Sequence, residues 1–303
     1  MEAPPDLADY EVISCLGYGA RSTIYAVSER RTGQLYALKR VIRRGPEDDR
    51  FLEQAEIEYS ISSQLDHPAL RKTYRIIKRR NFLRVTELYL LMEMFDGTSL
   101  DIQRPNSMSS LIKIFTQVAG GLSSMHKAGY VHADIKPNNL LVDENGQVKV
   151  IDYGQSCSIG TVKSRIQGTP DYIAPEQVNR GPLTPATDIF NLGATLYWCT
   201  TDRHVPTLIP KKRQGVASVD KQFVAPYELN LKVPLPLSRL IMDCVQNRPS
   251  ERPPDMTTVI SRLETALSVA KSMRREAKGQ PGIPKRLASA VPESKDDSHD
   301  EAP

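Results

Sequence analysis

The stretch HADIKPNN, from His132 to Asn139, gathers side chains suited to handling phosphate and metal. It holds an acid at Asp134, a lysine at Lys136 and an amide at Asn139 within six positions. Carboxylate and amide oxygens are hard ligands of the kind that magnesium prefers, and a lysine neutralises phosphate oxygens. The spacing therefore indicates phosphate chemistry with a divalent cation.

Two glycines nearer the N-terminus can add a phosphate-binding loop. Gly17 and Gly19, in LGYGARSTIY, allow the backbone to turn tightly over a ligand and to aim amide groups at phosphate oxygens. Glycines at strand ends are more often simple turns, so this signal is weak by itself. Ser22 takes the place of the third glycine in the usual loop pattern, which stiffens the loop without removing its backbone donors.

The lysine of YALK, Lys39, lies on an apolar strand and needs an anionic partner, because an unpaired buried ammonium is costly. The helical segment that follows offers Glu58, with Glu56 and Glu53 as alternatives. Without such a partner, Lys39 would only extend into solvent.

The elements that must position these residues fall into two groups. The first third of the chain alternates β-branched and aromatic residues, which predicts strands around one helix. The rest is mainly helical, with a short hairpin that turns at Asn145-Gly146 and a helix that ends at Gly129. Strands are expected at 10–29, 34–42, 73–80 and 87–94, and helices at 48–65, 109–129, 186–200 (apolar nearly all round, hence buried) and 257–277.

Size and composition describe a globular protein of one or two domains: 303 residues, 40% hydrophobic and 25% charged. No apolar run approaches the roughly 20 residues of a membrane helix, and the N-terminus does not look like a signal peptide. The four scattered cysteines contain no CxxC pair, which suits a reducing cytoplasm. The net charge of +4 is small, so we do not expect nucleic acid binding despite basic runs such as KRR at 78–80.

In order and spacing, these segments resemble the eukaryotic-type (Hanks-type) serine/threonine protein kinase family, in a bacterial-like form. The shared motifs are the glycine loop, the strand lysine, the helix glutamate, HADIKPNN in place of the usual HRD motif, DYG at 152–154 in place of DFG, and APE at 174–176. Asp188 and Arg252 also fit. GTPDYIAPE and the lysine at Lys136 resemble the serine/threonine branch more than the tyrosine branch.

The resemblance runs from about residue 10 to 270 and implies an α+β fold of two lobes. A small β-rich lobe would span about 10–94 and a larger helical lobe about 95–270, with the nucleotide cleft between them. Residues 1–9 would be an N-terminal extension. Residues 271–303 would be a tail, basic and then acidic, which we expect to be disordered.

The family assigns a role to each residue of the phosphotransfer chemistry. Asp134 would orient the substrate hydroxyl and Lys136 would steady the γ-phosphate of ATP, both braced by Thr169. Lys39 would hold the α- and β-phosphates and pair with Glu58. Because catalysis then needs mainly positioning and charge neutralisation, these groups suffice.

The resemblance also implies the metal and adenine contacts. Asn139 and Asp152 would ligate Mg²⁺, or Mn²⁺ in its place. Met92 would be the gatekeeper behind adenine, and Glu93 to Phe95 the hinge that binds its edge. The remaining residues around the nucleotide would be Leu16, Gly17, Gly19, Ile24, Ala37 and Leu141. Two structural features are expected besides: a buried ion pair between Glu176 and Arg252, and an anchor for the catalytic-loop backbone at Asp188.

Ala133 departs from the family pattern. The family usually has an arginine there, which meets a phosphate on the activation segment but touches neither the γ-phosphate nor the metals. We therefore expect a live enzyme whose basal activity does not depend on a phosphate held by residue 133. The segment from Asp152 to Glu176 still offers the hydroxyls of Ser156, Ser158, Thr161 and Ser164.

Two other interpretations stay open. A pseudokinase, acting as a nucleotide-binding scaffold, is disfavoured because such proteins usually lose the strand lysine, the catalytic acid or the metal-binding acid. A small-molecule kinase of related fold would lack the GTPDYIAPE segment. The expected partners are ATP, protein substrates, and a regulatory protein or upstream kinase. Ser289, three positions after Arg286, is a candidate for autophosphorylation, although the tail around it also fits a solvated linker.

Overall fold

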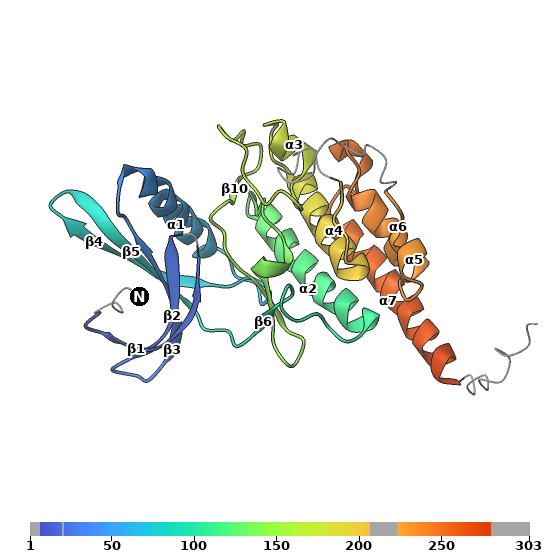
Figure 1. Cartoon of the computed structure of the whole chain (residues 1–303), viewed down its shortest axis with the longest axis horizontal. Helices are drawn as coiled ribbons and strands as arrows, with labels where there is room; N and C mark the ends of the chain where they lie inside the picture. The colour runs from blue at the N-terminus through green and yellow to red at the C-terminus, as the bar shows by residue number, and fades with distance from the viewer. Residues whose placement is uncertain (1–6, 20, 207–222, 280–303) are drawn as a thin grey trace, which may run out of the picture.

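The chain folds into a small lobe rich in β-strands and a larger helical lobe (Figure 1). The computed structural model describes residues 7–19, 21–206 and 223–279. This arrangement confirms the expected α+β, two-lobed fold class.

The small lobe is a five-stranded antiparallel sheet in the order β1-β2-β3-β5-β4 with one helix, α1, against it. Side chains alternate between the two faces of the sheet along strand β5, as they do in any β-strand. Leu88, Leu90 and Met92 point to the face covered by α1. Tyr89 and Leu91 point to the opposite face. The elements are β1 (Tyr10–Tyr18), β2 (Ser22–Glu29), β3 (Leu35–Ile42), a 3-10 turn (Pro46–Asp48), α1 (Asp49–Ser62), β4 (Thr73–Asn81) and β5 (Arg84–Glu93).

Four helices form the core of the large lobe, where α2 packs on α7, and α6 packs on both α4 and α7. Helix α4 is buried along most of its length, as its apolar sequence predicts. Ser107 caps helix α2, since its side chain accepts a hydrogen bond from the Ser110 amide, and Gly129 at φ +88° follows the helix. The helices are α2 (Met108–Lys127), α3 (Pro175–Val178), α4 (Pro185–Thr201), α5 (Pro226–Leu229), α6 (Leu235–Cys244) and α7 (Met256–Gly279).

Short strands at the cleft side of the large lobe carry the segments with chemical side chains. Strand β8 forms the predicted hairpin with β9, whose turn places Gly146 at φ +77°, and β10 pairs with β7. These strands are β6 (Thr98–Ser99), β7 (Tyr130–Val131), β8 (Leu140–Val142), β9 (Val148–Val150) and β10 (Cys157–Ser158), and 3-10 turns lie at Pro137–Asn139 and Pro249–Glu251.

Backbone hydrogen bonds join the two lobes behind the cleft. The Val150 amide donates to the Ala69 carbonyl at 2.7 Å, and the Arg71 amide donates to the Val150 carbonyl at 3.1 Å. The segment that enters β4 is therefore tied to the strand that leads into Asp152, which fixes the small lobe relative to that carboxylate.

The predicted tail, 271–303, begins too early, whereas the helix expected at 257–277 is confirmed as α7. Helix α7 continues to Gly279, so residues 271–279 are helical. The physical reason is that the sequence SVAKSMRREAK contains good helix formers and no Gly or Pro, which lets the helix run on beside the start of α2. Residues 280–303, including Ser289, lie outside the described residues, as do residues 1–6 of the predicted extension. Among the described helices, none combines the length and the apolar character needed to cross a bilayer.

Candidate nucleotide and phosphotransfer site

Lys39 lies on β3 between two carboxylates. Its Nζ is 2.6 Å from Oε2 of Glu58 on α1 and 3.4 Å from Oδ1 of Asp152. Burial disfavours the Lys39 ammonium, but Asp152 and Glu58 outweigh that effect and raise its pKa. Lys39 in turn lowers the pKa of Asp152 to about 2, so that carboxylate stays ionised at neutral pH. The alternative partner Glu56 instead bonds Lys78 at the surface.

Asp134 and Lys136 form a second, compact cluster with Thr169. The Lys136 Nζ donates to Asp134 Oδ2 at 2.8 Å and to Thr169 Oγ1 at 2.9 Å. Asp134 Oδ1 accepts from both the Thr169 amide, at 3.1 Å, and the Thr169 hydroxyl, at 2.8 Å. This brace holds the carboxylate and the ammonium in one geometry before any ligand arrives.

Asn139 and Asp152 carry oxygen atoms of the kind that a divalent cation binds. The Asn139 Nδ2 donates to the Asp134 carbonyl at 2.9 Å, which orients the amide and leaves its Oδ1 without a hydrogen bond from any described residue. The Asp152 side chain is 45% exposed. Among the described residues no cluster of three His, Cys, Asp or Glu side chains forms a metal cage, and Mg²⁺ at a nucleotide site does not require one.

The catalytic-loop backbone is held by Asp188, as expected. One oxygen of this buried carboxylate accepts from the His132 amide at 2.9 Å and the other from the Ala133 amide at 2.7 Å, while His126 Nε2 lies 2.8 Å away. Burial alone would raise the pKa of Asp188, but the hydrogen bonds from His126 and the His132 amide lower it. Ala133 itself has φ +61°, an uncommon conformation for a residue with a Cβ. Its amide and its carbonyl must therefore both be held by hydrogen bonds.

Gln177 fixes the other end, and sequence analysis missed it. Its Nε2 donates to the Ala133 carbonyl at 2.8 Å and to the Gln167 carbonyl at 3.2 Å. Its Oε1 accepts from the Ala174 amide at 2.9 Å and from Asn191 Nδ2 at 3.1 Å. One buried amide thus joins the catalytic loop, the activation segment and α4. Only its position directly after the APE motif could have drawn attention to it.

The activation segment is tied down by backbone pairing. Cys157 and Ser158 of β10 pair with β7, and the Ile159 amide donates to the Gly129 carbonyl at 2.9 Å. Further along, the Gly160 amide donates to the Leu183 carbonyl at 2.7 Å, and the Leu183 amide donates back to Thr161 at 2.9 Å. Backbone hydrogen bonds therefore hold this segment against β7 at one end and against Leu183 at the other.

The environment of Ala133 is apolar. Its side chain is 2% exposed and packs with Val131 and Leu183, with Cys157 beside them. Ser156 is also fully buried and donates to the His132 carbonyl at 3.3 Å, so it supports the loop. Of the four hydroxyls expected to be open to modification, Ser156 is therefore excluded by burial.

The apolar residues predicted to enclose adenine come from both lobes. Ala37 on β3 pairs in register with Met92 on β5, and both are buried in one cluster with Ile24 alongside. Leu141 lies on β8 of the large lobe. The Glu93 amide already donates to the Lys72 carbonyl at 2.9 Å, so Glu93 can offer a ligand only its carbonyl.

The remaining predicted contacts lie on the glycine loop and the hinge. Leu16 is half exposed on β1, and Gly17 pairs with Ile24 across β1 and β2. The Gly19 amide donates to the Ser22 carbonyl at 2.7 Å, which closes the turn. Phe95 follows β5 in the connection to the large lobe.

Tyr153 takes the place of the usual phenylalanine at no evident cost. Its ring is 1% exposed and lies 5.5 Å from the His132 ring. Its hydroxyl donates to the Val150 carbonyl at 3.0 Å, so the extra polar group is satisfied. Burial raises the pKa of this phenol, which stays neutral.

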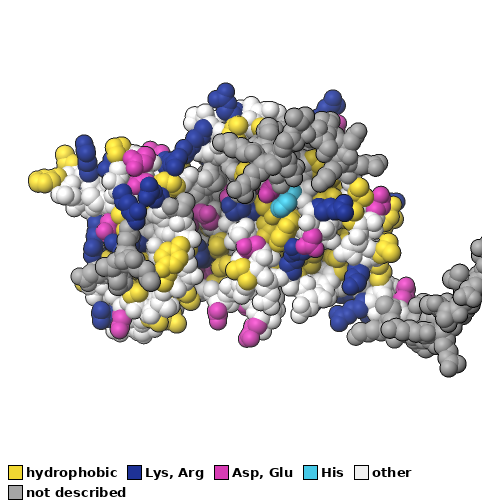
Figure 2. All heavy atoms as spheres, in the orientation of Figure 1, with side chains coloured by type: hydrophobic (Ala, Val, Ile, Leu, Met, Phe, Trp, Pro, Cys, Tyr) yellow, Lys and Arg dark blue, Asp and Glu magenta, His cyan; other side chains and the backbone are white. Residues whose placement is uncertain are grey.

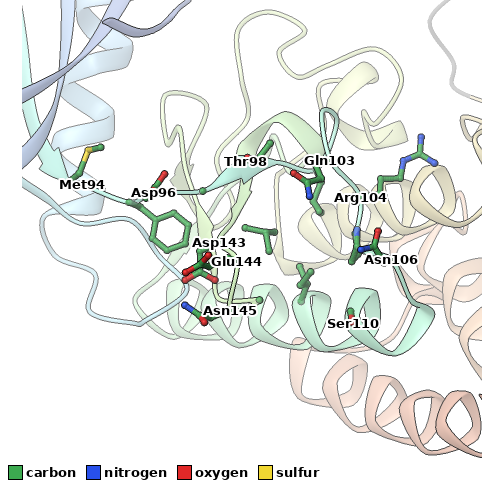
Figure 3. Close-up of a pocket in the computed structure, with 17 residues that line it drawn as sticks. Met94, Asp96, Thr98, Gln103, Arg104, Asn106, Ser110, Asp143, Glu144 and Asn145 are labelled. Atoms are coloured by element: carbon green, nitrogen blue, oxygen red, sulfur yellow. The ribbon is translucent and has the colours of Figure 1, made fainter. Parts of the chain in front are cut away.

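A separate recess lies beyond the hinge. Residues 95–107 reach α2 through β6 and a turn, with no helix between, and a cavity of about 720 Å³ opens between this segment, α2 and the β8–β9 turn. Asp96, Asp143 and Glu144 lie near one end of it and Arg104 and Asn106 near the other (Figure 3). Of the predicted site residues, only the hinge lines this recess, so it is distinct from the phosphotransfer site.

Arg104 fastens this segment to α4. Its guanidinium lies 3.9 Å from the centroid of the Trp198 ring and 2.5 Å from a carboxylate oxygen of Asp202. A cation over an indole face is attracted by the ring quadrupole. Arg104 therefore takes part in the packing of this segment against α4.

The motifs, the two-lobed fold and the two clusters around Lys39 and Asp134 together define a class of protein. The chain belongs to the protein kinase domain family, whose model matches residues 10–262. The expected Glu176–Arg252 ion pair is present as well, with two contacts at 2.7 and 2.9 Å.

Curated relatives agree with this assignment. A protein named probable serine/threonine-protein kinase from Clostridium acetobutylicum is 27% identical over 84% of this chain and 39% of its own length. Serine/threonine-protein kinase PknL of Mycobacterium tuberculosis is 31% identical over 65% of this chain and 50% of its own length. Sperm motility kinase 2A of Mus musculus is 26% identical over 81% of this chain and 48% of its own. The chain thus spans half or less of the length of these relatives.

Proposed function

We propose that this protein is a serine/threonine protein kinase that transfers the γ-phosphate of ATP to hydroxyls of protein substrates in the presence of Mg²⁺. The observation that carries the proposal is the assembled geometry of Lys39. Its ammonium bonds a glutamate of the small lobe and an aspartate of the large lobe at once, which is the arrangement that phosphoryl transfer requires. The names of the relatives support the serine/threonine class.

In this proposal each residue acts through charge or position. Lys39 contacts the α- and β-phosphates, and Asp134 accepts a hydrogen bond from the substrate hydroxyl and orients it towards the γ-phosphate. Lys136 neutralises charge that develops on the transferred group. Asn139 and Asp152 would hold magnesium, which when bound would further neutralise the charge of the phosphate oxygens. The apolar walls of the cleft and the hinge backbone hold adenine.

We further propose that transfer does not need a phosphate on the activation segment. The segment is already ordered by strand pairing and by Gln177, and the site of the usual arginine is an apolar cluster around Ala133. Control would then come through a regulatory protein or another kinase acting elsewhere on the chain.

The test compares wild type with Lys39→Met and Asp152→Ala, using Mg-ATP and a generic Ser/Thr substrate. Each variant should lose at least about 100-fold in transfer rate, because an electrostatic group at the reacting phosphate is removed. Lys72→Met and Asp66→Ala are matched controls, since these residues form an exposed pair at 3.5 Å, and both should retain activity. ATP binding by wild type with no transfer to any of several substrates would favour a pseudokinase scaffold instead.

Independence from phosphorylation is tested with a triple variant, Ser158→Ala, Thr161→Ala and Ser164→Ala. Ser156 is left in place because its buried hydroxyl supports the catalytic loop. The variant should keep wild-type activity, as should wild type treated with phosphatase. Loss of activity in a triple variant that melts at the wild-type temperature would refute this part of the proposal.

A further inference from the structure

The hairpin of β4 and β5 ends in two apolar residues that face solvent. Phe82 is 97% exposed and Leu83 is 91% exposed, more than any other large hydrophobic residue of the described chain. The hairpin projects from the small lobe on the side away from the large lobe (Figure 1), and hydrophobic side chains form its outermost point (Figure 2). An isolated exposed leucine is ordinary, but an aromatic and a leucine side by side at a protruding tip are not.

The backbone at this tip has a conformation that is unfavourable for a bulky residue. Asn81 and Arg84 pair across the hairpin, so Phe82 and Leu83 form a two-residue connection, and Phe82 has φ +53°. Tight hairpin turns favour Gly, Asn or Asp at positive φ, and a bulky residue there is an outlier. Neither folding nor solubility explains a phenylalanine at this position, so the ring suggests a function outside the fold.

The strands behind the tip are strongly basic. From Lys72 to Thr86 the sequence contains six basic residues and no acidic one. Lys78 bonds Glu56 at 2.6 Å and Arg79 lies over the Tyr89 ring, whereas Arg80 and Arg84 are exposed directly beside the tip. Lys and Arg side chains lie close behind the apolar point (Figure 2).

We propose that this hairpin binds the surface of an anionic lipid bilayer, inserting Phe82 and Leu83 at the level of the headgroups while Arg80 and Arg84 contact lipid phosphates. An apolar tip with basic flanks matches an anionic interface, which attracts Lys and Arg and accepts aromatic and aliphatic side chains. A protein partner is less suited, because a stable interface buries about 800 Å² on each side and this convex tip offers two side chains.

Membrane binding through this hairpin leaves the phosphotransfer site accessible. The tip points away from the large lobe, which carries Asp134 and Asp152 (Figure 1). The proposal does not depend on kinase activity, since vesicle binding is measured without ATP.

The test is sedimentation of the full chain with vesicles of phosphatidylcholine alone and of phosphatidylcholine with phosphatidylserine. Wild type should bind the anionic vesicles, bind the neutral ones far more weakly, and lose affinity as salt increases. Arg80→Ala with Arg84→Ala should lower partitioning into anionic vesicles about 25-fold, roughly fivefold for each charge. Phe82→Asn with Leu83→Ser should lower it at least about 10-fold. Asparagine tolerates the positive φ, so this variant folds.

Ile102→Ser with Leu231→Ser is the matched control, because these side chains are 77% and 84% exposed at other places on the surface. It should bind vesicles as wild type does. Three outcomes would overturn the proposal: no binding of wild type to anionic vesicles at low salt, equal loss in the control, or full binding by the Phe82→Asn, Leu83→Ser variant. Tight binding of an oligonucleotide that is insensitive to this variant, with no vesicle binding, would assign the basic strands to nucleic acid.

Discussion

Replacing Gln177 with leucine should lower both the free energy of unfolding of the protein and its transfer activity. Leucine fills a similar volume, so the change removes hydrogen bonds and leaves little cavity. The Ala133 carbonyl and the Ala174 amide both lose the partner that the buried Gln177 provides, at original distances of 2.8 and 2.9 Å. Each buried group left unsatisfied costs about 1–3 kcal/mol, and the longer bonds to Gln167 and Asn191 add less.

The sum is a loss of about 4 kcal/mol in the free energy of unfolding. For a domain of this size, that corresponds to a fall in Tm of roughly 8–16 °C. Activity should also fall at least about tenfold at temperatures where the variant is folded, because Asp134 directly follows the residue whose positive φ is released. The assays are thermal melts and steady-state transfer to a Ser/Thr substrate.

Gln103→Leu is the control, since Gln103 is exposed and the same substitution there removes no buried hydrogen bond. It should melt within about 1 °C of wild type, as surface changes usually do. A Gln177→Leu variant that melted like this control, or that kept full activity, would show that Gln177 is not what holds Ala133 and the activation segment together.

Three further changes test other parts of the structure. Arg252→Ala leaves the Glu176 carboxylate buried without its partner and should cost about 3–5 kcal/mol in denaturant unfolding; a loss below about 1 kcal/mol would contradict a structural ion pair. Asp255→Ala removes the acceptor for the Thr258 amide at the start of α7 and should cost about 1 kcal/mol at neutral pH. That bond lowers the pKa of Asp255, so the stabilisation that it gives is lost as the pH falls below about 4. The difference in free energy of unfolding between wild type and variant should therefore narrow there. A difference that does not change with pH would contradict this role of Asp255. Ala133→Arg should destabilise by about 1–3 kcal/mol because the site is buried and apolar, and a stable variant that phosphorylation activates would contradict our account of this position.

Much of the candidate site could be predicted because its residues have strong individual requirements. A lysine on an apolar strand needs an anion, and the structure supplies Glu58 from the neighbouring helix. The family resemblance implied that Asp188 anchors the catalytic loop, and its carboxylate accepts hydrogen bonds from the His132 and Ala133 amides. The strands and the buried helix α4 followed equally from apolar periodicity.

The rest depends on contacts between distant segments, which no local pattern encodes. Gln177 is an ordinary polar residue until the fold brings it under Ala133. Ser156 is a polar residue that the sequence alone would leave accessible, yet packing buries it. Phe82 lies between the two strands expected at 73–80 and 87–94, and only the structure shows that its side chain points outward from a tight turn.

The packing of Arg104 on Trp198 gives this protein a built-in optical reporter. Trp198 is the chain's single tryptophan, so its emission has one origin. The guanidinium over the indole ring belongs to the segment that leaves the hinge. The His204 ring stacks on the same indole, with 6.5 Å between the two ring centroids. A change in indole emission on adding nucleotide or peptide would therefore report displacement at the junction of that segment with α4, without any attached label.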